Sequence, residues 1–156
     1  VTVYGPRENE THAIMALIYK ALNKQDPYEI WGTGQQSRDF TFVYDIVRGF
    51  VMIAEKINDC TPINLGTGKK YKIIDVANMI FDIIGWRPKE IKLDTSKPVG
   101  VEERALDISK AKELLGWEPL YDLYEGLKIT IEWYKNEKKH LITGIINEKL
   151  LFERAG

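Results

Sequence analysis

The stretch 62–85, PINLGTGKKYKIIDVANMIFDIIG, contains the pattern that decides the fold class. Its apolar start, Pro62 to Leu65, is typical of a buried strand, and Gly66-Thr67-Gly68 then predicts a tight turn. From Ile73 to Ile84, apolar residues recur with the period of a helix, and Gly85 stands where a C-terminal cap belongs. A strand, a glycine turn and a helix in direct succession indicate an α/β fold.

Similar elements alternate on both sides of this stretch. Apolar alternation and turn residues predict short strands at 1–4, 28–31, 38–43 and 90–93. Helical periodicity and capping residues predict helices at 11–23, from 45 onward, 109–115 and 122–134. The helix from Asp45 is expected to bury an apolar face formed by Ile46, Val47, Phe50, Ile53, Ala54 and Ile57. Asn9 or Thr11 is expected to cap the first helix.

Composition excludes several classes of protein and partner. The 156 residues, 44% of them hydrophobic, predict one globular domain with a core of its own. The 22 basic and 23 acidic side chains nearly cancel, so we expect no nucleic-acid partner. No apolar run is long enough to span a bilayer, so we expect no membrane partner. One cysteine, Cys60, and two histidines offer no disulfide and no zinc cluster, which favours a reducing, cytoplasmic location.

Two motifs of cofactor chemistry have simpler interpretations here. Gly66-Thr67-Gly68 follows a predicted strand and precedes a helix, as a dinucleotide-binding loop does, but the third glycine is missing. A tight turn without cofactor is the better interpretation. Tyr124 with Lys128 and Tyr134 with Lys138 have the Tyr-x-x-x-Lys spacing, which places both side chains on one helix face. Because no glycine loop precedes them, a solvated helix surface is favoured.

Five motifs occur in a fixed order along the chain. They are Tyr4-Gly-Pro-Arg-Glu8, Trp31-Gly-Thr-Gly34, Arg38-Asp-Phe-Thr-Phe-Val43 with Asp45, Asn64-Leu-Gly-Thr-Gly68, and Asp107-Ile-Ser-Lys-Ala-Lys112 with Leu115-Gly-Trp117 and Pro119. In this order they resemble the C-terminal half of the NAD(P)-dependent nucleotide-sugar epimerases, dehydratases and reductases, which are extended short-chain dehydrogenases. The resemblance covers residues 1 to about 135 and implies a nucleotide-sugar-binding domain of short strands and packed helices, followed by a tail of uncertain structure at 136–156.

The same resemblance implies that the chain is a fragment. Family members carry the cofactor glycine loop and the catalytic Tyr-x-x-x-Lys upstream of the Tyr-Gly-Pro motif, and this chain begins at Val1. NAD or NADP is therefore expected to be bound by a missing N-terminal Rossmann half, with no cofactor-binding residue in this chain. The full-length enzyme is expected to form a homodimer, and this chain alone is expected to be inactive.

Site residues follow from the resemblance and agree with simple chemistry. Arg38 matches the family's diphosphate-binding residue, and a guanidinium pairs with phosphate oxygens through two parallel hydrogen bonds. Arg104 matches a second cationic position, with Lys97 as a weaker candidate in the same loop. Trp31 is expected to cover the sugar or the base, with a buried core position as the alternative. Asp39 is expected to point away from Arg38.

Within the family, the pattern is most similar to the GDP-fucose synthases. The segment His12 to Lys20 resembles a helix that begins with an acid/base histidine and ends with a basic substrate contact, and Ser96 to Gly100 resembles a substrate loop. His12 is thus a candidate proton donor or acceptor, against the alternative of a polar surface residue. A UDP-sugar 4-epimerase, a 4,6-dehydratase and a stand-alone, non-catalytic binding module remain as alternatives.

Overall fold

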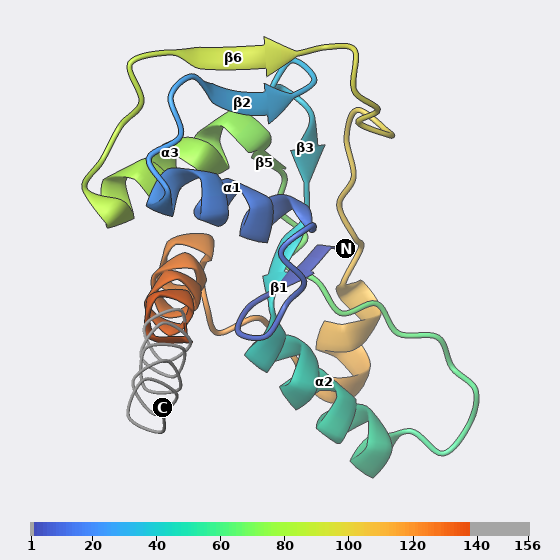
Figure 1. The fold of residues 1–156 in the computed structure, drawn as a ribbon. Helices are drawn as coiled ribbons and strands as arrows, with labels where there is room; N and C mark the ends of the chain where they lie inside the picture. Colours follow the sequence, from blue (N-terminus) through green and yellow to red (C-terminus); the bar gives the residue numbers. More distant parts are fainter. Residues whose placement is uncertain (1, 138–156) are drawn as a thin grey trace, which may run out of the picture.

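The structure is a computed structural model and describes residues 2–137. Two helices lie against a pair of parallel strands in its upper part (Figure 1). The strands pair in register from Tyr28 opposite Ile91 to Trp31 opposite Asp94. A short antiparallel pair lies beside them. These elements are β2 (Tyr28–Trp31), β6 (Ile91–Asp94), α1 (Ala13–Leu22), α3 (Ile73–Ile84), β3 (Ser37–Arg38) and β5 (Tyr71–Lys72).

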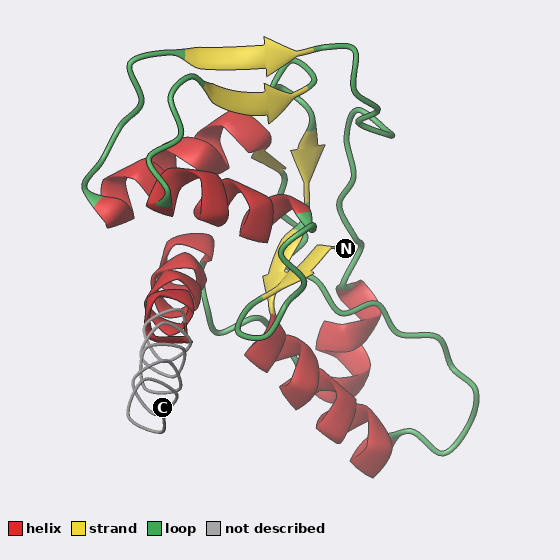
Figure 2. Cartoon of the chain, in the orientation of Figure 1, coloured by secondary structure: helices red, strands yellow, loops and turns green. Residues whose placement is uncertain are grey.

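A second parallel pair and the remaining helices form the lower part (Figures 1 and 2). The first strand pairs with the second from Thr2 opposite Phe40 to Tyr4 opposite Phe42, and the second leads directly into a long helix. Residues 123–137 are helical and lie below α1. The named elements are β1 (Thr2–Tyr4), β4 (Phe40–Phe42), α2 (Val43–Lys56) and the short helix η1 (Ala111–Leu115).

Two separate clusters of buried side chains hold these parts together. The larger cluster joins α1, α3 and the helix 123–137 through residues such as Ile18, Ile80 and Leu127. The smaller cluster joins α2 to η1 and is centred on Trp117. The α/β class with short strands and packed helices is therefore confirmed, and Gly85 and Gly116 end their helices in the left-handed conformation, as the sequence predicts.

Three local predictions are wrong. Residues 62–65 form no strand, although Leu65 is buried, and the stretch 38–43 is divided at Asp39 into β3 and β4. The N-cap of α1 is His12, and neither Asn9 nor Thr11 caps that helix. Asn9 instead accepts two hydrogen bonds from Thr11, which closes a turn before the helix begins.

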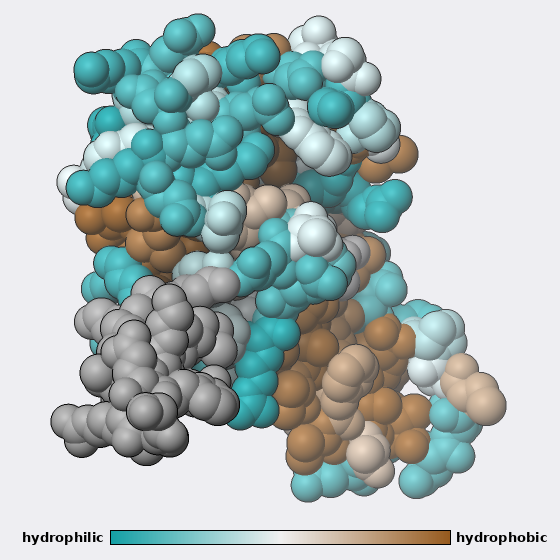
Figure 3. Space-filling view, in the orientation of Figure 1, coloured by the Kyte–Doolittle hydropathy of each residue, from teal (hydrophilic) through white to brown (hydrophobic). Residues whose placement is uncertain are grey.

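The predicted apolar face of α2 is only partly buried. Ile46 is buried, whereas Val47, Phe50 and Val51 are 53%, 62% and 52% exposed, and Ala54 is also exposed. Figure 3 shows hydrophobic residues gathered on the surface in the region of α2. The prediction of a fully buried face is thus wrong for the described residues, because the small cluster around Trp117 covers one side of α2 only.

Candidate functional site

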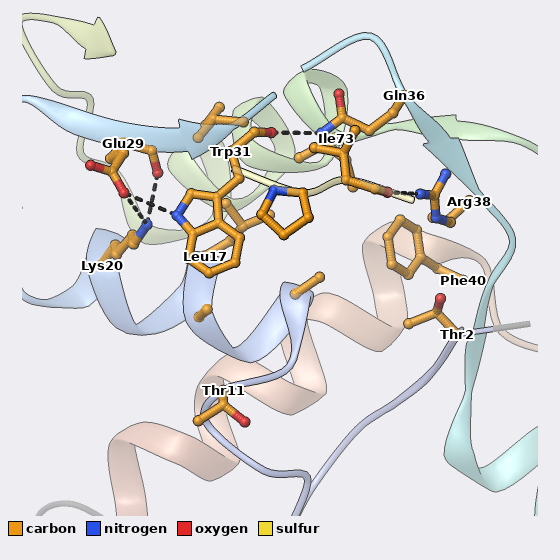
Figure 4. Close-up of a pocket in the computed structure, with 15 residues that line it drawn as sticks. Thr2, Thr11, Leu17, Lys20, Glu29, Trp31, Gln36, Arg38, Phe40 and Ile73 are labelled. Atoms are coloured by element: carbon orange, nitrogen blue, oxygen red, sulfur yellow. Dashed lines mark hydrogen bonds and ion pairs between the residues drawn. The ribbon is translucent and has the colours of Figure 1, made fainter. Parts of the chain in front are cut away.

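A cleft of about 470 Å³ opens between α1 and the strands β2 and β3 (Figure 4). Its walls are mostly apolar. Charged residues stand at its two ends: Lys20 and Glu29 at one, and Arg38 at the other. The apolar lining residues include Leu17, Ile30, Phe40, Ile73, Pro98 and Val99. A long ligand with an apolar or aromatic middle and an anionic group at the Arg38 end would suit this distribution.

Backbone carbonyls hold the Arg38 guanidinium in place. Nη1 donates to the carbonyl oxygens of Ser37, at 2.7 Å, and Glu102, at 3.4 Å, and Nη2 donates to that of Val99. Among the described residues, none provides a carboxylate partner for Arg38. Burial lowers the pKa of Arg38, and the charge of Arg104 lowers it further. The end of the cleft thus carries a positive charge that has no counterion among residues 2–137.

Arg104 comes to the same end from a distant part of the sequence. Its backbone N–H donates to the carbonyl of Ser37, 3.2 Å away, and a β-bridge joins Ser37 to Glu103. Arg104 is exposed and does not line the cleft itself. The structure therefore brings the two predicted arginines together, close enough for their charges to interact unfavourably. A bound anion would relieve that repulsion.

Trp31 lies in the cleft and not in the core. It is 49% exposed, so the alternative of a buried core tryptophan is wrong. Its Nε1–H donates to Glu29 Oε1 at 3.0 Å, and Lys97 Nζ lies 5.7 Å from the centre of its ring. Lys20 Nζ donates to the Glu29 carbonyl at 2.9 Å. Lys20 and Trp31 thus both contact Glu29, and Lys97 joins the group through the Trp31 ring, at and beside the cleft.

His12 is placed differently from the other predicted site residues. Its neighbours Thr11 and Ala13 line the cleft, but His12 does not, and its side chain is 61% exposed. Its Nδ1 lies 3.0 Å from Oε1 of Glu8, a largely buried carboxylate whose pKa is raised by burial. The role of His12 as an acid/base group stays a prediction.

The glycine turn 66–68 faces a carboxylate of the protein. The backbone N–H groups of Thr67 and Gly68 donate to Asp39, at 3.0 and 2.9 Å. Donors used in this way are not free for a dinucleotide phosphate, and the carboxylate would repel one. The residues of this turn therefore do not fit NAD, and the interpretation as a tight turn agrees with the geometry.

Sequence reasoning missed several polar residues of the cleft, among them Glu29 and Gln36. Glu29 is two residues before Trp31 on β2, and side chains at i and i+2 of a strand share a face, so this spacing could have revealed it. Gln36 lines the cleft and donates from Nε2 to the Trp31 carbonyl at 2.7 Å, while its Oε1 is buried without a partner among the described residues. Residues 2–137 contain no cluster suited to a metal ion and no helix long and apolar enough to cross a membrane.

Comparison with known proteins identifies the relatives of this chain. Residues 2–130 match the family model described as GDP-mannose 4,6 dehydratase. A UDP-glucuronate 4-epimerase of Thermodesulfobacterium geofontis is 39% identical over 92% of this chain, and a probable GDP-L-fucose synthase 1 of Oryza sativa subsp. japonica is 32% identical over 85% of it. They are matched over 44% and 42% of their own lengths.

A solved structure gives the same result for the fold. The UDP-glucuronic acid 4-epimerase of Bacillus cereus, in complex with UDP-glucuronic acid and NAD, superimposes with a TM-score of 0.78 at 34% identity. The match covers 86% of this chain and 43% of that protein. The chain thus spans less than half the length of these relatives. The predicted resemblance is confirmed, and the chain belongs to the GDP-mannose 4,6-dehydratase family, among the NAD-dependent nucleotide-sugar epimerases, dehydratases and GDP-fucose synthases.

Proposed function

We propose that this chain binds a nucleoside-diphosphate sugar, as the C-terminal part of an NAD(P)-dependent epimerase or reductase of the GDP-fucose synthase type. The observation that carries the proposal is the convergence of Arg38 and Arg104, from segments 66 residues apart in sequence, at one end of a mainly apolar cleft. A diphosphate is the part of such a ligand that needs two guanidinium groups.

The contacts of Arg38 support a role as a fixed anion binder. Three backbone carbonyls hold its guanidinium, which has five N–H donors in total, so two donors remain for a ligand. A side chain held in this way loses little further freedom when a phosphate binds. Trp31 then offers an aromatic surface to the base or the sugar, with Lys20 and Glu29 as polar contacts beyond it.

A binding panel tests the proposal. Isothermal titration calorimetry of the chain with GDP-mannose, UDP-glucuronic acid, dTDP-glucose and ADP-glucose, each beside its free nucleoside, should show nucleotide sugars binding more tightly than nucleosides. A preference for GDP-mannose supports an enzyme of GDP-sugars, which includes the GDP-fucose synthase type and a GDP-mannose 4,6-dehydratase. A preference for a UDP or dTDP sugar supports the alternatives, a UDP-sugar 4-epimerase or a 4,6-dehydratase. Equal affinity for every nucleoside and its nucleotide sugar would contradict a diphosphate site.

The alternative from another class of function is a stand-alone binding module without catalysis. The chain spans 42 to 44% of the relatives' lengths, and this share alone does not separate a stand-alone module from a piece of a longer enzyme. Reading the gene upstream of the codon for Val1 separates them. An in-frame Gly-x-x-Gly-x-x-Gly followed by Tyr-x-x-x-Lys supports the enzyme, and a start codon without these motifs supports the module.

We expect the isolated chain to bind neither NAD nor NADP. Asp39 occupies the amide donors of the turn 66–68, and a dinucleotide phosphate would meet its negative charge there. Titration calorimetry at millimolar cofactor should give no saturable heat. Saturable binding that Gly66→Val abolishes would contradict this, since a Cβ on Gly66 would lie 2.9 Å from Asp39 Oδ2 and displace the turn.

The exposed face of α2 belongs to the same proposal, as a docking surface for an N-terminal Rossmann half that holds the cofactor and forms the homodimer. Val47, Phe50 and Val51 are all more than half exposed, and no further strand of the described residues joins the parallel pair β1 and β4. Parallel sheets are normally larger and covered by helices on both faces. An apolar helix face beside an incomplete parallel sheet suits a partner that would add strands and helices.

Polar substitution on this face should reduce dye binding and self-association of the isolated chain, with little change in its stability. Phe50→Ser with Val47→Ser should lower 8-anilinonaphthalene-1-sulfonate fluorescence and reduce self-association in sedimentation velocity. Because both side chains are exposed, the free energy of unfolding should change by no more than about 0.5 kcal/mol per site. Tyr124→Ser, at another exposed site, is the control and should leave dye binding unchanged.

A further inference from the structure

Asp39 is a buried carboxylate, 1% exposed. It follows Arg38 directly in the sequence, but its side chain points to the other side of the chain, toward the glycine turn. As expected from the alternation of an extended strand, it makes no ion pair with Arg38. Its hydrogen bonds show what it does instead.

Three separate segments donate hydrogen bonds to this one carboxylate. The donors are Thr41 Oγ1 at 3.1 Å, Thr67 N at 3.0 Å and Thr67 Oγ1 at 2.6 Å to Oδ1, and Gly68 N at 2.9 Å and Leu106 N at 3.3 Å to Oδ2. Successive backbone N–H groups in a turn form a concave anion site. The turn 66–68 therefore is an anion site, and the anion it holds is part of the protein.

The glycines of the turn are explained by this contact. A Cβ on Gly66 would lie 2.9 Å from Asp39 Oδ2, and Gly68 has a φ of +70°, in the left-handed region that favours glycine. Gly66-Thr67-Gly68 thus resembles a cofactor loop because both kinds of loop must bring backbone N–H groups close to an anion.

Asp39 is linked to the segments of both arginines, to that of Arg38 through the chain and to that of Arg104 through one hydrogen bond. Arg38 is its neighbour on one side, and Leu106, whose N–H it accepts, is two residues after Arg104. Asp39 therefore fixes the segment that carries Arg104 against the strand that carries Arg38. We propose that Asp39 is a positioning residue for the diphosphate site, which sets the distance between the two guanidinium groups without touching the ligand. This inference rests on the proposed function.

Asp39→Asn is the first test, because asparagine has the same shape but only one acceptor oxygen. Its Nδ2 group would face N–H donors of the turn or of Leu106, so these contacts would be lost. We expect the affinity for UDP-glucuronic acid and for GDP-mannose to fall about 10-fold or more, the usual effect of losing hydrogen bonds to a charged group. The affinity for uridine and guanosine should change less than about 3-fold.

Asp45→Asn is the matched control. Asp45 is also 1% exposed, accepts two backbone N–H bonds, from Leu120 at 2.9 Å and Tyr121 at 3.1 Å, and like Asp39 does not line the cleft, but its hydrogen bonds do not join the segments of Arg38 and Arg104. Asp45→Asn should lower the melting temperature as Asp39→Asn does, and it should leave the nucleotide-sugar affinity within about 3-fold of that of the unsubstituted chain. If both variants weaken the binding equally, Asp39 is only structural and the inference is wrong.

A double-mutant cycle gives a readout that a purely structural role would not change. Because Asp39 acts through the placement of Arg104, Asp39→Asn combined with Arg104→Ala should bind little more weakly than Arg104→Ala alone. Fully additive losses would overturn the inference. If Asp39→Asn does not fold, Thr67→Val replaces it in the cycle, since it removes one donor and leaves the carboxylate in place.

Failure of the inference and failure of the proposed function are distinguishable. Absence of any preference for nucleotide sugars over nucleosides in the original chain would refute the proposed function. Amide hydrogen exchange of Gly68 and Leu106 tests, without any ligand, whether Asp39 holds these two segments. Both amides should exchange at least about 10-fold faster in Asp39→Asn than in the original chain, as expected when a hydrogen bond to a charged group is lost. Unchanged exchange at both amides would contradict the positioning role of Asp39, whatever the ligand data show.

Discussion

Arg38→Ala should weaken the binding of UDP-glucuronic acid or GDP-mannose by about 1.5 to 3 kcal/mol, which is the range for hydrogen bonds to charged groups. Arg104→Ala should cause a loss of the same size. The reason is that each variant removes one of the two positive charges that meet at the end of the cleft, where the protein supplies no counterion to Arg38 among the described residues. Titration calorimetry measures the change directly.

Uridine and guanosine serve as controls for this prediction, because they carry the base without the diphosphate. Their affinity should change little in either variant. Arg87→Ala controls for the loss of a surface arginine, since Arg87 pairs with Asp82 beside α3 and does not line the cleft. Equal losses for nucleoside and nucleotide sugar would show that Arg38 and Arg104 shape the cleft and do not bind the diphosphate.

The helices could be predicted from the sequence because their signals are local. The periodic residues 73–84 and the left-handed Gly85 place α3 with the same limits in sequence and structure. Asp122 caps the last helix by accepting the N–H of Glu125 at 2.8 Å, as the capping-box spacing predicts. These features depend only on residues a few positions apart.

The strands were harder to predict than the helices, because a strand forms only where another segment pairs with it. Residues 62–65 have an apolar strand pattern, but they form no pair within the described chain. Asn64 donates to the carbonyl of Asp107 at 3.1 Å, and the turn that follows is held by Asp39. Side-chain hydrogen bonds from distant residues thus replace the ladder that the pattern indicates. The exposed side of α2 has a similar cause, because periodicity predicts an apolar face but not what covers it.

For the site, the sequence supplied the arginines but not their arrangement. Arg38 and Arg104 came from the resemblance, and only the fold shows that the backbone of Arg104 bonds to Ser37, beside Arg38. Asp39 stands inside the Arg38 motif, but the motif does not predict its contacts. Its five hydrogen bonds come from residues up to 67 positions away. Contacts of that range are not visible in a local pattern.

The second large effect concerns stability. Trp117→Ala should lower the free energy of unfolding by about 3 to 5 kcal/mol, because the indole is fully buried at the centre of the smaller core and its loss leaves a cavity. The Nε1–H also donates to the Asp45 carbonyl at 3.1 Å, and that acceptor would lose its partner. Thermal unfolding followed by circular dichroism should show the melting temperature falling by about 10 to 20 °C.

Trp31→Ala should have the opposite effects. Trp31 is half exposed in the cleft, so its removal should change the free energy of unfolding by less than about 1 kcal/mol while nucleotide-sugar affinity falls. Trp117 belongs to the core of α2 and η1, away from the cleft, so below the melting temperature of Trp117→Ala the ligand should still bind. Loss of binding in the folded Trp117→Ala variant would show that the two cores are coupled, and that the geometry of the cleft depends on how α2 is held.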